Sequence, residues 1–210
     1  VLDTPLPIGA TSDPTPDLSV RFSDTGGSGY GSTSSWTVTR VGDIMSPSGA
    51  PLAGETTGHI TKTSPALAEG LHTVDITVKD DAGNPATLSW SFTVDLTAPS
   101  PPANVTAPDP TNDTTPTFTW DAAIDPGGSG IKGYILEVWT TGGGAKIRGP
   151  FDGITGTTYT LLLPDAISPD GEYQVRVWSV DKADNVSGTY GSDTFVLDTG
   201  KPVLSNGTPT

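Results

Sequence analysis

Cysteine is absent from this chain of 210 residues, and histidine occurs only at His59 and His72. Without cysteine the chain can form no disulfide, no thiolate metal site and no thiol-based catalytic site. Two histidines leave little for imidazole acid–base chemistry or for a zinc site. Aspartate and glutamate therefore remain as the main candidate metal ligands and catalytic groups.

Lysine and arginine are also scarce: together they number 10, against 24 aspartates and glutamates, which gives a net charge of −14. Such a surface repels nucleic acid and anionic membranes and attracts cations. No apolar run approaches the roughly 18 residues that a membrane-spanning helix needs, and no signal peptide is visible. We therefore expect no nucleic-acid partner and no membrane insertion.

Two pairs of motifs reveal an internal repeat. "DTGGSG" begins at Asp24 and "DPGGSG" at Asp125, which are 101 residues apart. "GLHTVDITVKDDAGN" at Gly70 and "GEYQVRVWSVDKADN" at Gly171 have the same separation of 101 residues. One offset kept over half a domain indicates a duplicated structural unit of about 100 residues.

The unit boundaries are marked by three related junction segments, "VLDTPLP" at Val1, "VDLTAPSPP" at Val94 and "VLDTGKP" at Val196. They predict one domain over residues 1–96, a second over 97–199, and the start of a further repeat or a linker over 200–210. The expected partners are therefore neighbouring repeats of the same polypeptide. Abundant Thr, Ser, Gly and Asp with few Lys resembles extracellular bacterial repeat proteins, which implies an extracellular or cell-surface location.

Each unit alternates apolar and polar residues with the period of two that is typical of β-strands. Clusters of Gly, Pro, Asn and Asp separate these runs, as turns require, and no segment has a helical period. The pattern predicts an all-β chain of two tandem antiparallel β-sandwiches. The expected strands cover residues 17–22, 34–40, 71–80 and 86–95 in the first unit and 117–120, 133–139, 157–163, 172–181 and 193–198 in the second.

The second unit resembles a fibronectin type III domain, through Trp120, Tyr134, "YTL" at 159–161 and "DGEYQVRVWSVD" at 170–181. Tyr173 stands where that family has its corner tyrosine, whose hydroxyl bonds back to the backbone. The first unit resembles bacterial Ig-like repeats, through "HTVDITVKDDAGN" and "SFTVDLTAP". There His72 replaces the corner tyrosine, which leaves the corner hydrogen bond an open question. Tryptophans on the inward phase are expected in the cores: Trp36, Trp90 and Trp120.

Acidic loops recur at one end of each expected sandwich, where the incoming linker meets two loops: "DTGGSG" and "DDAGN" in the first unit, and "DPGGSG" and "DKADN" in the second. Calcium binds six to eight oxygen ligands on adaptable loops, and carboxylates, amides and backbone carbonyls supply them. The sequence therefore suggests a calcium ion, Ca2+, at each junction, with ordinary turn chemistry as the alternative. The candidate ligands are Asp3, Asp24, Asp80 and Asn84 in the first unit and Asp95, Asp125, Asp181 and Asn185 in the second.

Three outward-phase side chains of the second unit form a second candidate site. If Tyr134 and Tyr173 point inward, then Trp139, Arg176 and Trp178 point outward on neighbouring strands. Such a group could stack as cation–π pairs, bind a sugar ring or contact another protein. The structural stack and the glycan- or protein-binding surface are both left open by the sequence.

Catalysis has little support, because the carboxylates lie in turn motifs that repeat between units and no catalytic motif is readable. The leading hypothesis is a non-catalytic spacer of a larger secreted or surface protein, of the adhesin, surface-layer or filament type, made rigid by calcium at its junctions. The alternatives are a carbohydrate- or protein-binding module and an accessory domain of a polysaccharide-degrading enzyme.

Overall fold

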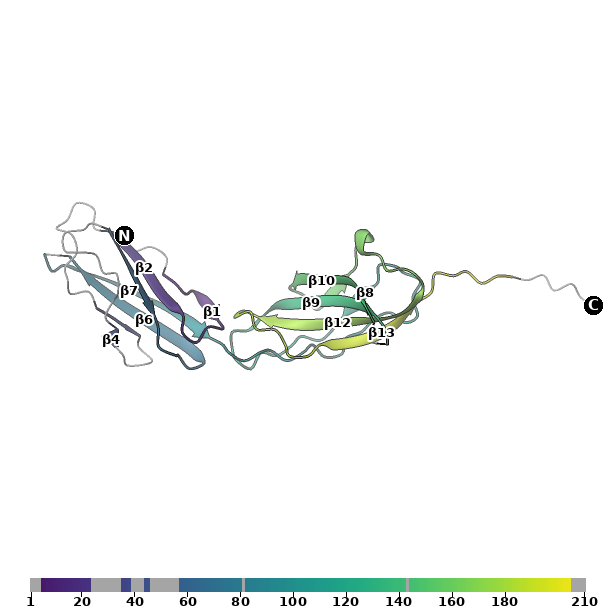
Figure 1. Ribbon diagram of the computed structural model, residues 1–210, viewed down its shortest axis with the longest axis horizontal. Helices are drawn as coiled ribbons and strands as arrows, with labels where there is room; N and C mark the ends of the chain where they lie inside the picture. The colour runs from purple at the N-terminus through teal and green to yellow at the C-terminus, as the bar shows by residue number, and fades with distance from the viewer. Residues whose placement is uncertain are drawn as a thin grey trace, which may run out of the picture. The chain divides into compact units, whose positions relative to one another are not determined.

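A computed structural model describes residues 5–23, 35–38, 44–45, 57–80, 82–142 and 144–204 (Figure 1), with backbone alone for 22, 35–38, 44–45 and 57–62. The chain divides into two compact units. The first comprises Val1–Thr97 with Pro126–Gly130 and Lys182–Asn185, and the second comprises Ala98–Asp125, Ile131–Asp181 and Val186–Thr210. Two short loop segments from later in the chain thus belong with the residues that end at Thr97.

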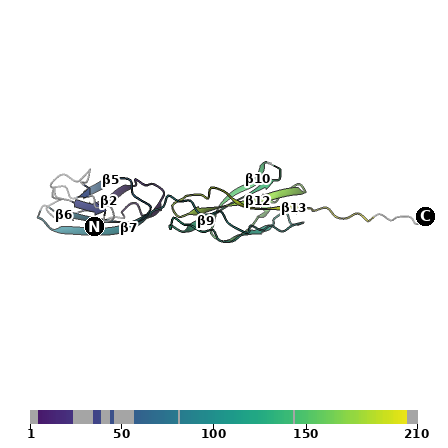
Figure 2. The ribbon, with the colours of Figure 1, turned by 90° about the horizontal axis from the view of Figure 1, so that it is seen from below.

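The first unit consists of two sheets (Figures 1 and 2). One sheet has the order β1-β7-β6-β3-β4 and the other pairs β2 with β5. Among its described strands, every pair is antiparallel except that of β1 with β7. The strands are β1 (Gly9–Thr11), β2 (Asp17–Ser23), β3 (Ser35–Val38), β4 (Ile44–Met45), β5 (Thr57–Thr63), β6 (Gly70–Lys79) and β7 (Pro85–Val94).

The core of the first unit follows directly from the period-two pattern of its strands. On β6 the alternate residues Val74, Ile76 and Val78 are buried, and between them lie the partly exposed Thr73, Asp75 and Thr77. Leu18 and Val20 of β2 pack into the same cluster from the facing sheet. Trp90 of β7 is partly buried against this cluster, whereas the side chain of Trp36 lies outside the described residues.

The second unit has a four-stranded antiparallel sheet of order β10-β9-β12-β13 and a two-stranded sheet, β11-β8. A fifteen-residue core between them includes the buried Phe118, Trp120, Leu136 and Val175. The strands are β8 (Thr117–Thr119), β9 (Ile131–Thr140), β10 (Lys146–Ile154), β11 (Thr158–Thr160), β12 (Gly171–Asp181) and β13 (Gly191–Leu197). The expected all-β fold of tandem sandwiches is confirmed, and within the described ranges the only helical element is a short 3-10 turn, η1 (Leu163–Asp165).

A corner hydrogen bond closes the start of β6 in the first unit and the start of β12 in the second. In the second unit the Tyr173 hydroxyl donates to the carbonyl oxygen of Pro169, four residues earlier. In the first unit His72 Nε2 lies 2.6 Å from the carbonyl oxygen of Ala68, also four residues earlier. Because a carbonyl only accepts, Nε2 must carry the proton. The question that the sequence left open is thus answered: His72 replaces the corner tyrosine and keeps its hydrogen bond.

In the part of the chain that the structure describes, no helix has the length and apolar character needed to cross a membrane.

Candidate functional site

Asp95 is a wholly buried carboxylate that directly follows β7. Its backbone N–H donates to the carbonyl oxygen of Thr11 (3.0 Å), which extends the β1–β7 ladder by one residue. Its side chain accepts two backbone hydrogen bonds: Thr97 N donates to Oδ1 (3.1 Å) and Ser129 N donates to Oδ2 (3.0 Å). The Asn185 side-chain amide donates to the Asp95 carbonyl (2.9 Å). Strand, linker and both loop segments therefore converge on one residue.

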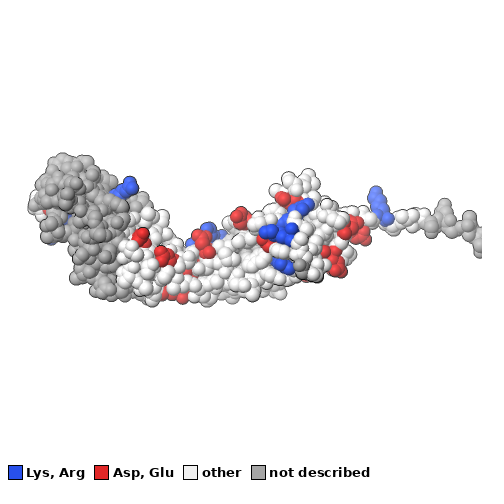
Figure 3. Space-filling view, in the orientation of Figure 1, with Lys and Arg blue, Asp and Glu red and all other residues white. Residues whose placement is uncertain are grey.

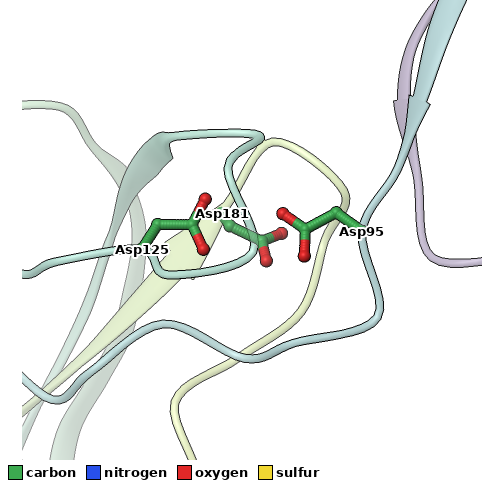
Figure 4. A group of neighbouring side chains, drawn as sticks. All are labelled: Asp95, Asp125 and Asp181. Carbon is green, nitrogen blue, oxygen red and sulfur yellow. The ribbon is translucent and has the colours of Figure 1, made fainter. Parts of the chain in front are cut away.

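Two further aspartates lie beside it. Ligand oxygens of Asp95, Asp125 and Asp181 all lie within 4.8 Å of one another. Asp181 is the last residue of β12 and is fully buried, and Asp125 is half-buried. Figure 4 shows the carboxyl groups of Asp125 and Asp95 directed toward each other, with Asp181 between them. The three side chains that the sequence grouped from a distant linker and two loops are thus brought together.

Glu69 is a fourth carboxylate near this group, and sequence analysis missed it. Its Oε1 accepts hydrogen bonds from the backbone N–H groups of Leu96 (3.2 Å) and Thr97 (3.1 Å), and its Oε2 accepts from the Thr97 hydroxyl (3.0 Å). The repeat contained the signal: Asp170, 101 residues later, accepts from the hydroxyl of Thr199, which follows the next junction aspartate.

Close packing surrounds the carboxylate of Asp95. A Cβ placed on Gly127 would lie 1.9 Å from Asp95 Oδ1 and 2.8 Å from Glu69 Oε1. Only glycine fits at that position without displacing a carboxylate. Close approach to Asp95 therefore explains Gly127 of the "DPGGSG" motif. The next residue, Gly128, has a φ of +91°, a backbone conformation that glycine adopts without strain.

The electrostatics of Asp95 are decided by its hydrogen bonds. Burial raises the pKa of its carboxyl, but the hydrogen bonds from Ser129 and Thr97 outweigh burial, and the pKa lies below its ordinary value of 3.8. The group is therefore ionised at neutral pH and presents a negative charge to its neighbours. Aspartate oxygens and backbone carbonyls on loops are the ligand type that calcium binds.

The corresponding loop of the first unit is arranged differently. The backbone N–H of Asn84 donates to Asp80 Oδ1 (2.7 Å) and its side-chain amide donates to Oδ2 (2.7 Å). The Asn84 side chain, followed by backbone N–H groups, lowers the pKa of Asp80. This is the turn chemistry that the sequence offered as the alternative. Asp3 and Asp24 lie outside the described residues, so a metal site in the first unit stays a prediction.

The second candidate site lies on the outer face of the four-stranded sheet. Trp139, Arg176 and Trp178 are partly exposed, as the strand phase predicts. The Arg176 guanidinium carbon lies 4.3 Å from the ring centroid of Trp139 and 4.8 Å from that of Tyr190. Tyr190 in turn meets Trp178 edge-on, with centroids 5.1 Å apart. We call these four residues the aromatic face. Tyr190 was missed because it precedes β13 and no alternation marks it.

Comparisons with known proteins cover both units. Residues 10–96 match the bacterial Ig-like domain family and residues 100–189 match the fibronectin type III domain family. Among curated proteins the chain is similar to Exoglucanase B of Cellulomonas fimi, with 30% identity over 147 residues. That match covers 66% of this chain and 12% of the exoglucanase, so the chain spans about one eighth of that relative.

Two solved structures are similar to this chain. The fibronectin(III)-like modules of Clostridium thermocellum CbhA superpose with a TM-score of 0.51 at 15% identity, covering 94% of this chain and 93% of theirs. The FN1–FN3 domains of chicken CNTN1 give a TM-score of 0.49 at 10% identity, covering 90% of this chain and 62% of theirs. With the family matches, the sandwiches and the corner bonds in agreement, the chain contains a bacterial Ig-like domain over residues 10–96 and a fibronectin type III domain over residues 100–189, in tandem.

Proposed function

We propose that this chain is a pair of non-catalytic accessory modules, acting as a spacer, within a larger extracellular polysaccharide-degrading protein. The observation that carries this proposal is the 30% identity over 147 residues with Exoglucanase B, most of which lies outside the match. The similarity to fibronectin(III)-like modules of CbhA supports the module architecture. Among the roles that the sequence left open, this observation favours the accessory domain over the adhesin or filament.

The surface of the first unit suits a spacer. Four of the five outward residues of β6 are polar, namely Thr73, Asp75, Thr77 and Lys79, and the fifth is the exposed Leu71. Thr73 also bonds across to the Ser91 hydroxyl of β7 (2.9 Å). A polar outer face resists sticking to partners, which is what a module that only separates others requires.

The experiment for the accessory role uses the full-length polypeptide that contains this segment. Deleting residues 97–199 should lower activity on insoluble polysaccharide and leave activity on soluble oligosaccharides unchanged. The isolated chain should release no reducing sugar from either substrate. Release of sugar by the isolated chain, or equal loss on both substrates, would contradict the proposal.

Calcium at the linker is the second part of the proposal. Two fully buried aspartates and one half-buried aspartate have oxygens within 4.8 Å of one another. Each close pair of like charges costs on the order of 1 kcal/mol or more near a protein surface. A calcium ion turns this repulsion into attraction and ties Asp95 to the two residues that lead into the loops. The residues present are of the kind that calcium takes, since all are oxygen donors on linker or loop termini.

Thermal unfolding in calcium and in chelator tests this part. Binding only to the folded state raises stability by about 2.7 kcal/mol at a hundredfold excess over the Kd. Calcium should therefore raise the melting temperature of the wild type but not that of Asp95→Ala or Asp181→Ala. Asp152→Ala, which removes an exposed aspartate of β10 outside the candidate ligand set, is the matched control and should keep the calcium response. Equal melting temperatures in calcium and chelator would remove calcium from the proposal and leave the spacer role standing.

A further inference from the structure

Arg176 occupies an unusual position in this acidic chain. It lies on the outer face of β12, directly opposite Glu137 of β9 in the antiparallel register. A direct ion pair between these two residues would be the ordinary outcome. Instead, Glu137 Oε2 accepts a hydrogen bond from the Trp139 indole (2.9 Å) and Oε1 pairs with Lys146 (3.0 Å). Both oxygens of the nearest carboxylate are thus already used.

The guanidinium of Arg176 is held by neutral groups alone. Its Nε donates to the Gln174 side-chain oxygen (2.7 Å), and Trp139 and Tyr190 lie over it at 4.3 and 4.8 Å. Among the described residues its two Nη nitrogens make no hydrogen bond and no carboxylate pairs with its charge. Five N–H donors in a rigid plane normally find partners, and the Nη edge is the side that binds a carboxylate through two parallel bonds.

The aromatic rings fix the orientation of this edge. Trp139 lies in the row of Gln174 on the sheet, and Tyr190 directly precedes Gly191, which pairs with Val177. The rings therefore approach Arg176 from rows on either side of it and restrict the rotation of its side chain. A guanidinium fixed before binding loses less entropy when a ligand arrives.

The strands of this sheet carry mixed charges: Lys132, Lys146, Arg148 and Arg176 are basic, and Glu137, Asp152, Glu172, Asp181 and Asp193 are acidic. Lys146, Arg148 and Arg176 all lie on β10 and β12, and Arg148 bonds to backbone carbonyls rather than to a carboxylate. In the view of Figure 3, Lys and Arg atoms gather over the second unit near β10. At physiological salt, charges farther away than about 8 Å are largely screened, so the charged groups nearest Arg176 decide which ligand binds there.

We propose that the aromatic face binds a uronic-acid residue of a polysaccharide, with the Arg176 Nη edge holding the carboxylate. The pyranose C–H groups then pack on the exposed rim that Trp178 and Tyr190 form, and Tyr190 is a 39% exposed residue. This inference rests on the proposed role in a polysaccharide-degrading protein, which favours a sugar over an acidic peptide. It deepens that role by naming the ligand class, the uronic acids, whose carboxylate a neutral glucan lacks.

The test is isothermal titration calorimetry of the full chain with tetragalacturonate, cellotetraose and a tetra-aspartate peptide. Tetragalacturonate should bind and the other two should not. Arg176→Gln and Arg176→Lys should each weaken binding about 10-fold or more, because both lose the two parallel bonds of the fork. Lys79→Gln, which removes a charge from the first unit, is the matched control and should bind as the wild type does.

Four outcomes would overturn the inference. Cellotetraose binding as tightly as tetragalacturonate would mean that the carboxylate is not recognised, and equal binding of the peptide would mean that the sugar is not. Wild-type affinity in Arg176→Lys, with near-UV circular dichroism unchanged, would mean that charge alone acts. Absence of any binding would make the aromatic face a purely structural stack. None of these results affects the outcome of the deletion experiment, so the accessory role is tested independently of this inference.

Discussion

The two units use the same loop motif, Asp-x-Ala-x-Asn, for different purposes. In the first unit Asp80 and Asn84 satisfy each other and form a self-contained turn. In the second unit Asp181 is buried, and the Asn185 side-chain amide donates to the Asp95 carbonyl. Local sequence determines the turn in both places. What lies beside the turn determines whether the motif holds only itself or also holds a linker.

Glycine substitutions should give the largest difference in stability between the two loops, the close-packed one that contains Gly127 and the open one that contains Gly83. Gly127→Ala places a Cβ 1.9 Å from Asp95 Oδ1, whereas Gly83→Ala meets no atom within 4 Å. Overpacking should destabilise Gly127→Ala by about 2 kcal/mol. Gly83→Ala should lose about 1 kcal/mol from its φ of +88° alone. Denaturant unfolding, followed by hydrogen exchange to assign each transition to a unit, measures the loss of stability in both variants. Equal losses would mean that the Asp95 side chain moves aside for the added Cβ at little cost.

The two corners give the next largest contrast. Tyr173→Phe removes the donor to Pro169 and should cost about 1–2 kcal/mol. His72→Phe also removes a donor, but it eliminates a buried Nδ1 that has no hydrogen-bond partner among the described residues. The first-unit variant should therefore lose about 1 kcal/mol less. If His72→Phe is the more damaging of the two in unit-resolved unfolding, the orphaned nitrogen carries no cost.

The loop asparagines give a smaller effect. Asn185→Ala removes the bond to the Asp95 carbonyl and should cost about 1 kcal/mol. Asn84→Ala opens only an exposed turn, so its unfolding midpoint should stay at that of the wild type. Hydrogen exchange should accelerate at residues 95–97 in Asn185→Ala and at residues 80–84 alone in Asn84→Ala. Protection at 95–97 unchanged in Asn185→Ala would show that Ser129 and Thr97 suffice to hold the linker.

Acid titration gives the smallest effect. The pKa of Asp95 lies below 3.8 in the folded chain, so its contribution to stability is present above the unfolded value and is lost as pH falls through the folded value. Carbon-13 NMR of the carboxyl groups should therefore show Asp95 and Asp80 both titrating below pH 3.8. Asp95→Asn should reduce the acid-induced loss of stability below about pH 4. A midpoint for Asp95 above 3.8 would mean that burial outweighs its hydrogen bonds.

Strands with regular alternation could be predicted from the sequence, and irregular ones could not. β6, β7, β9 and β12 were expected within two residues of their observed ends. β10 was missed because its sequence, "KIRGPFDGI", contains two glycines and a proline and its register with β9 shifts three times. β1, only three residues long, exists because β7 offers an edge for it, which is a tertiary cause that local sequence does not show.

The sequence predicted which aspartates of the candidate site lie together, but not the hydrogen bonds that hold them. Duplication of the loops allowed Asp95, Asp125 and Asp181 to be grouped although they are far apart in the chain. The acceptors of these side-chain amides could not be predicted from the sequence. Asn84 and Asn185 occupy equivalent positions, yet the Asn84 amide donates to the Asp80 carboxylate and the Asn185 amide donates to the Asp95 carbonyl. Glu69 and Tyr190 were missed because neither lies in a strand pattern, and only the folded backbone brings them to Thr97 and Arg176.

The parallel pairing of β1 with β7 has a mechanical consequence. Gly9, Ala10 and Thr11 run in the same direction as Phe92, Thr93 and Val94. Tension applied to the two ends of the unit therefore pulls the strands past each other, so their hydrogen bonds are loaded together rather than opened one after another. In the second unit the only parallel contact among described residues is the bridge of Thr111 with Leu197. Under stretching in a force spectrometer, the first unit should rupture at the higher load, so that the weaker domain extends first and protects its neighbour.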